Sequence, residues 1–286
     1  MKKLPVPFIP CAAAAGLMLA SGLSSSAQTV VFSDNFNTAN TSSFDSAPLT
    51  GRLSGLDASL VYGQSGGVEM GILNDQLQLV GQRGEIRFNN AGQTGATAPN
   101  LFDWSTGAGG TAITAAGGMT ISFNLTTPDT TDANNWVSVS VGAANADDTG
   151  SAPRVNNANN SAGILFRDTG ATAIFNNGTE YGVGEGSITP AGVSHFISIT
   201  YNFASWAAGS PVTMTATEDG SVVGTDSFTW DYAYQYIDLG SDTDLPGTDY
   251  LLVGNFTIST VPEPGTCGLL AGGLGLLLAF RNRRHI

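Results

Sequence analysis

Cysteine, cations and histidine are scarce in this 286-residue sequence. The two cysteines, Cys11 and Cys267, lie in apolar stretches near the ends, so the segment between them has no thiol with which to form a disulfide. From residue 28 to residue 260 there are 5 cations and 22 acidic residues, a net charge of 5 − 22 = −17. Because phosphate contacts require clustered lysine and arginine, we expect no nucleic-acid partner.

The shortage of histidine excludes several catalytic classes. His195 is the one histidine between residues 28 and 260, and no Gly-x-Ser-x-Gly elbow accompanies it. One histidine without cysteine also leaves few nitrogen and sulfur ligands for zinc. Since His195 begins an alternating apolar strand pattern, we predict that it is a hydrogen-bonded structural residue. A Glu-x-Asp-x-Glu strand motif is absent as well, which makes a glycan-active hydrolase the weakest functional alternative.

The N-terminus has the parts of a secretory signal peptide in their usual order. Lys2 and Lys3 precede an apolar run over residues 11–23, and small residues follow at Ser25 and Ala27. This order predicts export by the Sec machinery and cleavage after Ala27. Residues 1–27 are therefore expected to be a targeting helix that the mature protein lacks.

The C-terminus combines three features over residues 261–286. The triplet Pro262, Glu263 and Pro264 precedes an apolar stretch over 268–280, and a basic tail with Arg281, Arg283 and Arg284 follows. Thirteen helical residues rise about 20 Å, which is shorter than a hydrocarbon core of about 30 Å. The arginines are expected to stop transfer and remain cytoplasmic, which leaves everything N-terminal to them outside.

These three features together resemble the PEP-CTERM sorting signal. The resemblance implies recognition by an exosortase, a membrane-embedded cysteine protease. It also implies a bacterium with a Gram-negative type of envelope that makes exopolysaccharide. It says nothing about the domain attached to the signal.

Residues 28–260 read as one β domain, because apolar and polar residues alternate throughout. No window outside the two ends shows a helical stripe, and 91–118 and 144–161 read as long loops. Asp219 and Gly220 predict the clearest hairpin turn. The predicted strands are Thr29–Ser33, Val68–Leu73, Gln76–Gly81, Gly84–Asn89, Met119–Thr126, Asn135–Ala143, Ala162–Asp168, Ala171–Asn176, His195–Asn202, Pro211–Glu218, Ser221–Trp230 and Tyr250–Ser259.

So many strands in a cysteine-free domain predict an all-β sandwich of two antiparallel sheets, flanked by hydrophobic targeting helices at both ends. Five segments are informative together because of their order along the chain: Ser33–Phe36, Gly163–Arg167, His195–Tyr201, Glu218–Ser221 and Val253–Ile258. In this order they resemble the concanavalin A-like (laminin G-like) jelly roll. That resemblance implies that the first and last strands are neighbours.

Two stretches are candidate binding sites. Four carboxylates suit a Ca²⁺ ion, which prefers hard oxygen ligands, or else form a solvated acidic loop: Asp238, Asp242, Asp244 and Asp249. Aromatic rings recur at every second residue at Phe228, Trp230, Tyr232, Tyr234 and Tyr236. In an extended segment these rings share one face. The last four then form either a platform for sugar rings or a face packed into the core.

The sequence thus favours an exported, non-enzymatic protein of the cell surface or extracellular matrix, anchored transiently in the membrane. A carbohydrate-binding module for exopolysaccharide is the main alternative. Ca²⁺ is the one cofactor that the sequence suggests. The exposure of the rings from Trp230 to Tyr236 distinguishes the two functions, because exposed rings favour carbohydrate binding and buried rings favour a structural role.

Overall fold

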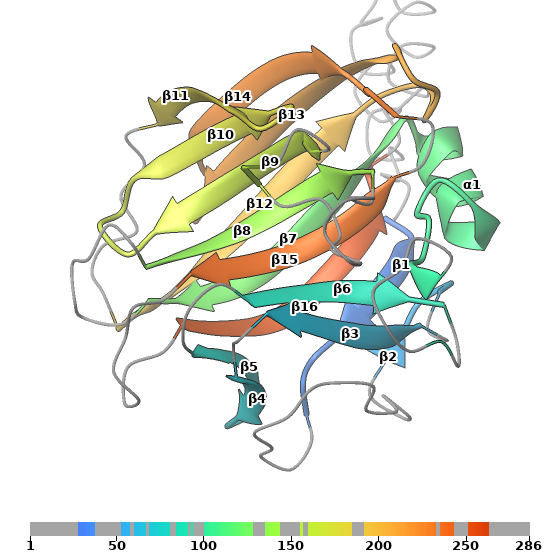
Figure 1. Ribbon diagram of the computed structural model, residues 1–286. Coiled ribbons are helices and arrows are strands. Elements are labelled where there is room, and N and C mark those ends of the chain that lie inside the picture. Colours follow the sequence, from blue (N-terminus) through green and yellow to red (C-terminus); the bar gives the residue numbers. More distant parts are fainter. Residues whose placement is uncertain are drawn as a thin grey trace, which may run out of the picture. The chain divides into compact units, whose positions relative to one another are not determined.

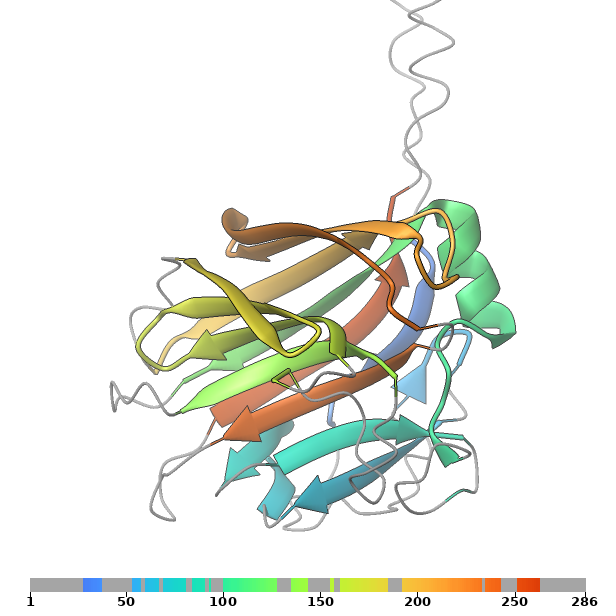
Figure 2. The same cartoon turned by 45° about the horizontal axis from the view of Figure 1, so that its top comes forward.

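Strands dominate the computed structural model and form two stacked sheets (Figures 1 and 2). All the helices and strands described below belong to the unit Gln28–Val261. The structure describes residues 28–37, 53–57, 60–66, 69–80, 84–90, 93, 100–127, 135–143, 155–156, 160–184, 192–232, 235–242 and 251–262.

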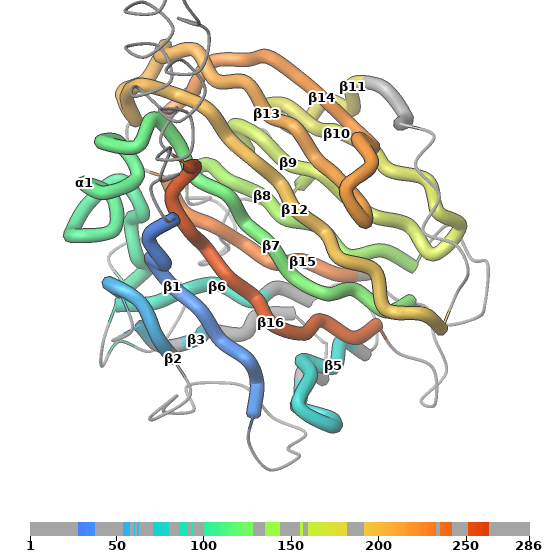
Figure 3. Tube along the Cα trace, turned by 180° about the vertical axis from the view of Figure 1, so that it is seen from behind, coloured from blue at the N-terminus to red at the C-terminus, as the bar shows by residue number. Residues whose placement is uncertain are grey.

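The first sheet has nine strands, and Figure 3 shows it from behind. Its strands follow the order β14-β13-β12-β7-β16-β1-β2, with β5 paired to β16 and β4 paired to β5. These strand pairs are antiparallel. The strands are β1 (Val30–Asp34), β2 (Leu53–Ser54), β4 (Glu69–Leu73), β5 (Gln76–Val80), β7 (Gly118–Thr126), β12 (Ser194–Asn202), β13 (Pro211–Glu218), β14 (Ser221–Thr229) and β16 (Leu251–Thr260).

The second sheet has seven strands in the order β11-β10-β9-β8-β15-β6-β3, again with antiparallel pairings. The strands are β3 (Val61–Gly66), β6 (Gly84–Asn89), β8 (Trp136–Gly142), β9 (Asn160–Arg167), β10 (Thr172–Asn176), β11 (Thr179–Gly184) and β15 (Tyr236–Asp242). The two antiparallel sheets confirm the predicted sandwich. Both hydrophobic targeting helices fall on residues outside the described ranges.

One apolar core fills the space between the sheets. Met119, Ile121, Phe123 and Leu125 on β7 have no exposed surface, and the valines of β8 face them across the sandwich. Phe32 packs edge-on against Phe88, with ring centroids 5.1 Å apart. Because the inward residues of both sheets belong to the same cluster, the sandwich depends on this core in the absence of a disulfide.

The first and last strands are neighbours, as the jelly-roll resemblance implied. β1 pairs with β16 in antiparallel register, with Asp34 opposite Phe256. At the ends of these strands the Thr29 N–H donates to Thr260 Oγ1 at 3.0 Å, and the Thr260 N–H donates to the Thr29 carbonyl at 2.9 Å. The chain therefore enters and leaves the sandwich at one place.

A helix occupies part of the segment that the sequence predicted as a loop. This helix, α1, spans Gly107–Ala116 and places Ile113 in the core. It ends at Gly117, which adopts the left-handed conformation with φ 83° and donates to carbonyls of the last turn. The prediction failed because the helix uses glycines rather than an apolar stripe to pack. A side chain at Gly110 would collide with the backbone of Ser105.

The alternation of apolar and polar residues located the predicted strands accurately. Each predicted strand is present, and its ends lie within one or two residues of the predicted ends. The predicted hairpin is also confirmed, because Glu218 pairs with Ser221 across the Asp219–Gly220 turn. Alternation missed the two-residue strand β2, and it missed β3 and β11, which are rich in small and polar residues. It also missed β15, whose acidic residues suggested a loop.

Candidate functional site

The aromatic residues from Phe228 to Tyr236 do not share one strand face. β14 ends at Thr229 in the nine-stranded sheet, and β15 begins at Tyr236 in the seven-stranded sheet, so the chain changes sheets between them. Trp230 is fully buried and Tyr236 is 9% exposed, whereas Tyr232 is half-buried. Tyr234 lies outside the described residues. The segment is therefore not one extended strand, because the chain passes from one sheet to the other within it. Sugar binding by Tyr232 and Tyr234 stays a prediction.

Trp230 belongs to an aromatic cluster within the core. Its ring stacks on Trp206 at 5.4 Å and meets Phe203 edge-on at 5.2 Å, while Phe228 lies 5.6 Å away. The indole Nε1 of Trp230 has no hydrogen-bond acceptor among the described residues. Trp230 therefore contributes packing, and it offers no ring face to a ligand.

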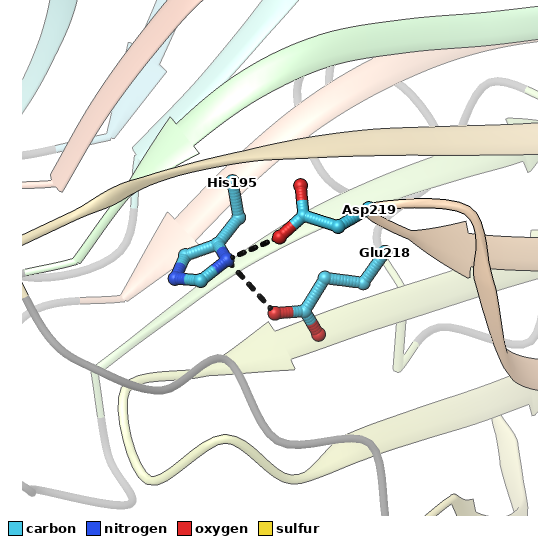
Figure 4. A group of neighbouring side chains, drawn as sticks. All are labelled: His195, Glu218 and Asp219. Carbon is cyan, nitrogen blue, oxygen red and sulfur yellow. Dashed lines mark hydrogen bonds and ion pairs between the residues drawn. The ribbon is translucent and has the colours of Figure 1, made fainter.

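His195 lies beside two carboxylates where β12 begins and the β13–β14 hairpin turns (Figure 4). Its Nδ1 is 2.8 Å from Asp219 Oδ2 and 3.3 Å from Glu218 Oε1. His195 and Glu218 are buried on the core side of their strands, whereas the Asp219 side chain is 56% exposed. His195 is thus hydrogen-bonded at a strand start, as its position in the pattern suggested.

Asp219 fastens the hairpin to β12. Its Oδ1 accepts the Phe196 N–H at 2.9 Å, and its own N–H donates to the Phe196 carbonyl at 2.9 Å. A positive φ of 47° at Asp219 and of 83° at Gly220 forms the tight turn that aims the carboxylate at His195. The sequence predicted the turn, but nothing in it showed that β12 would bring His195 to the same place.

The two carboxylates have pKa values displaced in opposite directions. Burial raises the pKa of Glu218, the His195 charge lowers it in part, and the Asp219 charge adds to the rise. Hydrogen bonds from the Phe196 N–H and from His195 lower the pKa of Asp219. Enzymes that use acid–base catalysis often have two carboxyl groups whose pKa values are displaced in this way. Here, however, one imidazole nitrogen lies within 3.3 Å of both carboxylates and is hydrogen-bonded to Asp219.

Asp238 occupies a buried polar row on the outer side of the seven-stranded sheet. It lies directly opposite Arg87 on β6 and Ser140 on β8, and Ser140 lies opposite Gly163 on β9. Asp238, Arg87 and Ser140 are all at most 3% exposed. Directly opposite residues share a sheet face, so Asp238 has a guanidinium as its cross-strand neighbour. It is a strand residue rather than part of the predicted acidic loop.

The other calcium candidates are placed only in part. Asp242 is the last residue of β15, and its backbone pairs with Trp136. Asp244 and Asp249 lie outside the described residues. The carboxylates from Asp242 onward stay a prediction for Ca²⁺.

The outer side of the nine-stranded sheet is rich in hydroxyl groups. One row across five strands joins Ser33, Thr257, Ser122, Ser198 and Thr217, each directly opposite the next. A second row joins Thr200, Thr215 and Thr225. With Thr213, these residues define the hydroxyl face, and each is half-buried or exposed.

The hydroxyl face is uncharged within the described residues. The outward positions of β7, β12, β13, β14 and β16 there include no acidic or basic side chain, because Glu218 and Asp226 lie opposite the inward residues Ile197 and Met214. Phe196 and Val222, 49% and 62% exposed, lie on the outer side next to these rows. The sequence showed these threonines only as the polar half of alternating strands, so it gave no separate signal for the face.

The sorting residues follow directly on the last strand. β16 ends at Thr260, and the exposed Pro262 is the last residue that the structure describes. Residues 260–284 match the PEP-CTERM protein-sorting motif. The PEP-CTERM motif indicates an exported protein with a C-terminal membrane-anchoring signal. Glu263, Pro264, Arg281, Arg283 and Arg284 lie outside the described residues. The described segments contain no helix with the length and apolar character of a membrane span.

No curated protein matches this chain in sequence. Several solved structures resemble it. The metal-free Emp46p carbohydrate recognition domain is 10% identical, with a TM-score of 0.44, and the match covers 77% of this chain and 98% of that one. The receptor binding domain of botulinum neurotoxin C/D mosaic serotype is 12% identical, with a TM-score of 0.46, over 86% of this chain and 51% of that one.

A sialidase is 11% identical, with a TM-score of 0.38, over 71% of this chain and 17% of that one. This chain therefore spans about half the length of the neurotoxin domain and less than a fifth of the length of the sialidase. At these identities the likeness concerns the arrangement of strands alone.

Proposed function

We propose that this chain is an exported, non-enzymatic protein of the cell surface or extracellular matrix. The match of residues 260–284 to the PEP-CTERM protein-sorting motif carries the proposal. According to this proposal, residues 1–27 direct Sec-dependent export and residues 28–260 form the exported sandwich. Residues 261–286 hold the protein in the membrane until an exosortase processes it. The charge of −17 on the sandwich segment supports a solvated extracellular role.

The non-enzymatic assignment is supported by the described titratable groups. The closest set of histidine and carboxylates is His195, Glu218 and Asp219, whose hydrogen bonds fasten the hairpin to β12. Asp238 has Arg87 as its neighbour within a sheet. Neither arrangement places two carboxylates across an open space, as glycoside hydrolysis requires.

Fractionation of the native host tests the sorting proposal. Replacing Pro262, Glu263 and Pro264 together with alanine is expected to leave the protein in the membrane fraction, whereas Thr266→Ala serves as a matched control. Mass spectrometry of the wild-type protein is expected to show an N-terminus near Gln28 and loss of the residues beyond the triplet. A full-length cytosolic product would contradict the proposal.

Carbohydrate binding is the second candidate, and the hydroxyl face favours it. A hydroxyl has one donor and two acceptor lone pairs, so it can bond to a polysaccharide hydroxyl even where it already bonds within the sheet, as Thr200 does with Thr120 at 3.2 Å. Within the described residues the face has no charge that would repel a sugar polymer, and Phe196 provides an exposed ring for stacking. We assign the binding to an uncharged polysaccharide and to this face rather than to Trp230.

Thr200→Val with Thr215→Val tests the assignment, because the two threonines lie directly opposite each other. Two lost hydrogen bonds at about 0.7 kcal/mol each weaken binding about tenfold. Retention on a neutral dextran and on an anionic alginate measures the effect, and Thr179→Val on the exposed part of β11 is the control. Equal retention of the double variant and the control would contradict the assignment. Failure of the wild-type protein to be retained on dextran would contradict it as well.

A further inference from the structure

Three potential metal-binding atoms converge at the start of β12 (Figure 4). His195 Nδ1, one Glu218 oxygen and one Asp219 oxygen all lie within 4.8 Å of one another. They come from two strands that pair side by side and from the turn between β13 and β14. The sequence suggested too few nitrogen and sulfur ligands for zinc, but it did not reveal that two carboxylates would complete the set.

The separations suit a small divalent ion. Zinc binds imidazole nitrogen at about 2.0–2.1 Å and carboxylate oxygen at about 2.0–2.2 Å, so neighbouring tetrahedral ligands lie about 3.3–3.4 Å apart. His195 Nδ1 and Glu218 Oε1 are already 3.3 Å apart. Nδ1 and Asp219 Oδ2, at 2.8 Å, must separate by about half an ångström to reach that ligand spacing. Asp219 lies in an exposed turn, where this adjustment is easily made.

Asp219 is also held in the way that metal ligands usually are. Its second oxygen accepts the Phe196 N–H, which directs the other oxygen toward His195. Hydrogen bonds of this kind orient metal-binding carboxylates and strengthen binding. The burial of His195 and Glu218 limits competition from water, while the exposed side of Asp219 provides a path of entry.

The chemistry of the three groups suits a divalent cation. One imidazole nitrogen and two carboxylate oxygens are ligands that Zn²⁺ takes in proteins. Three protein ligands also leave room for a water molecule as the fourth. We propose that His195, Glu218 and Asp219 form a binding site for a first-row divalent metal ion such as Zn²⁺, which fastens the β13–β14 hairpin to β12.

Calorimetric titration of the chelator-treated full-length chain with ZnCl₂ tests this site. One Zn²⁺ is expected to bind per chain. His195→Gln, which keeps a polar side chain of similar length, is expected to weaken binding at least a hundredfold. Glu180→Gln, an exposed carboxylate on β11, is the matched control and should leave the affinity unchanged. Co²⁺ in place of Zn²⁺ should give the visible absorption of a tetrahedral site.

Asp219→Asn provides a second variant should His195→Gln fail to fold, because its side chain is exposed. It too should lose affinity, while circular dichroism reports an intact β fold. Failure of the wild type to bind Zn²⁺, or equal affinity in Asp219→Asn and Glu180→Gln, would overturn the proposal. Binding that tracks Asp242→Asn rather than Asp219→Asn would overturn it as well. The titration uses purified protein, so none of these outcomes bears on export.

Discussion

Replacing Trp230 decides between the two interpretations of the aromatic stretch. The indole is fully buried and has four aromatic neighbours within 6.3 Å, namely Tyr201, Phe203, Trp206 and Phe228. Truncating a buried aromatic to alanine costs about 3–5 kcal/mol, since the surrounding rings refill the cavity only in part. With a urea m-value of about 3 kcal/mol/M, a loss of about 4 kcal/mol lowers the unfolding midpoint by roughly 1.3 M.

Trp230→Phe separates the packing of the ring from its N–H group. The variant keeps a ring in the cluster and removes an indole N–H that has no acceptor among the described residues. Removing an unsatisfied buried donor offsets part of the lost contact, so we expect a cost of about 1–2 kcal/mol. Tyr232→Ala, at a half-buried position two residues on, is the control and should cost less than Trp230→Ala. If Trp230→Ala lowered the midpoint no more than Tyr232→Ala, the placement of Trp230 in the core would be refuted.

Three further predictions concern a glycine, a buried carboxyl group and the candidate calcium ligands. Gly118 has φ 149° and its Cβ would meet the Tyr201 carbonyl, so Gly118→Ala should lower the melting temperature more than Gly117→Ala, whose Cβ meets nothing within 4 Å. Burial raises the pKa of Asp57, although its hydrogen bond with the Gly109 backbone opposes the rise. The folded state therefore holds this proton more tightly, so wild-type stability relative to Asp57→Asn should rise as the pH falls through the raised pKa toward 3.8. Melts at several pH values measure that difference, and a constant gap would contradict it. Low millimolar Ca²⁺ should raise the melting temperature of the wild type but not of Asp242→Asn with Asp244→Asn, and identical wild-type melts with Ca²⁺ and with chelator would remove this site.

The sequence was informative wherever side-chain size alternates with period two. In β12 the inward residues Ile197, Ile199 and Tyr201 are large and apolar and the outward ones are mostly polar, so the pattern gave the strand to within one residue. In β15 the inward Ile237 and Leu239 alternate with Asp238 and Gly240. The acidic residues suggested a solvated loop, because the sequence does not show that Arg87 lies opposite Asp238.

Sites built from distant segments were beyond the sequence for the same reason. His195 and Asp219 are 24 residues apart, and only the pairing of β12 with β13 brings their side chains together. The hydroxyl face likewise depends on registers between β1, β16, β7, β12 and β13. The sorting motif, by contrast, is contiguous, so the residues alone were enough to identify it.

The position of β16 determines how the sandwich responds to mechanical force. This strand lies between β7 and β1, and the C-terminal segment continues directly from its end. A pull along the length of β16 acts perpendicular to the hydrogen bonds on both of its sides, so the two ladders are loaded in shear and share the load. The mutual hydrogen bonds of Thr29 and Thr260 are the first to bear it. A sandwich pulled along this internal strand would resist unfolding better than one pulled away through an edge strand such as β14, whose hydrogen bonds break one at a time.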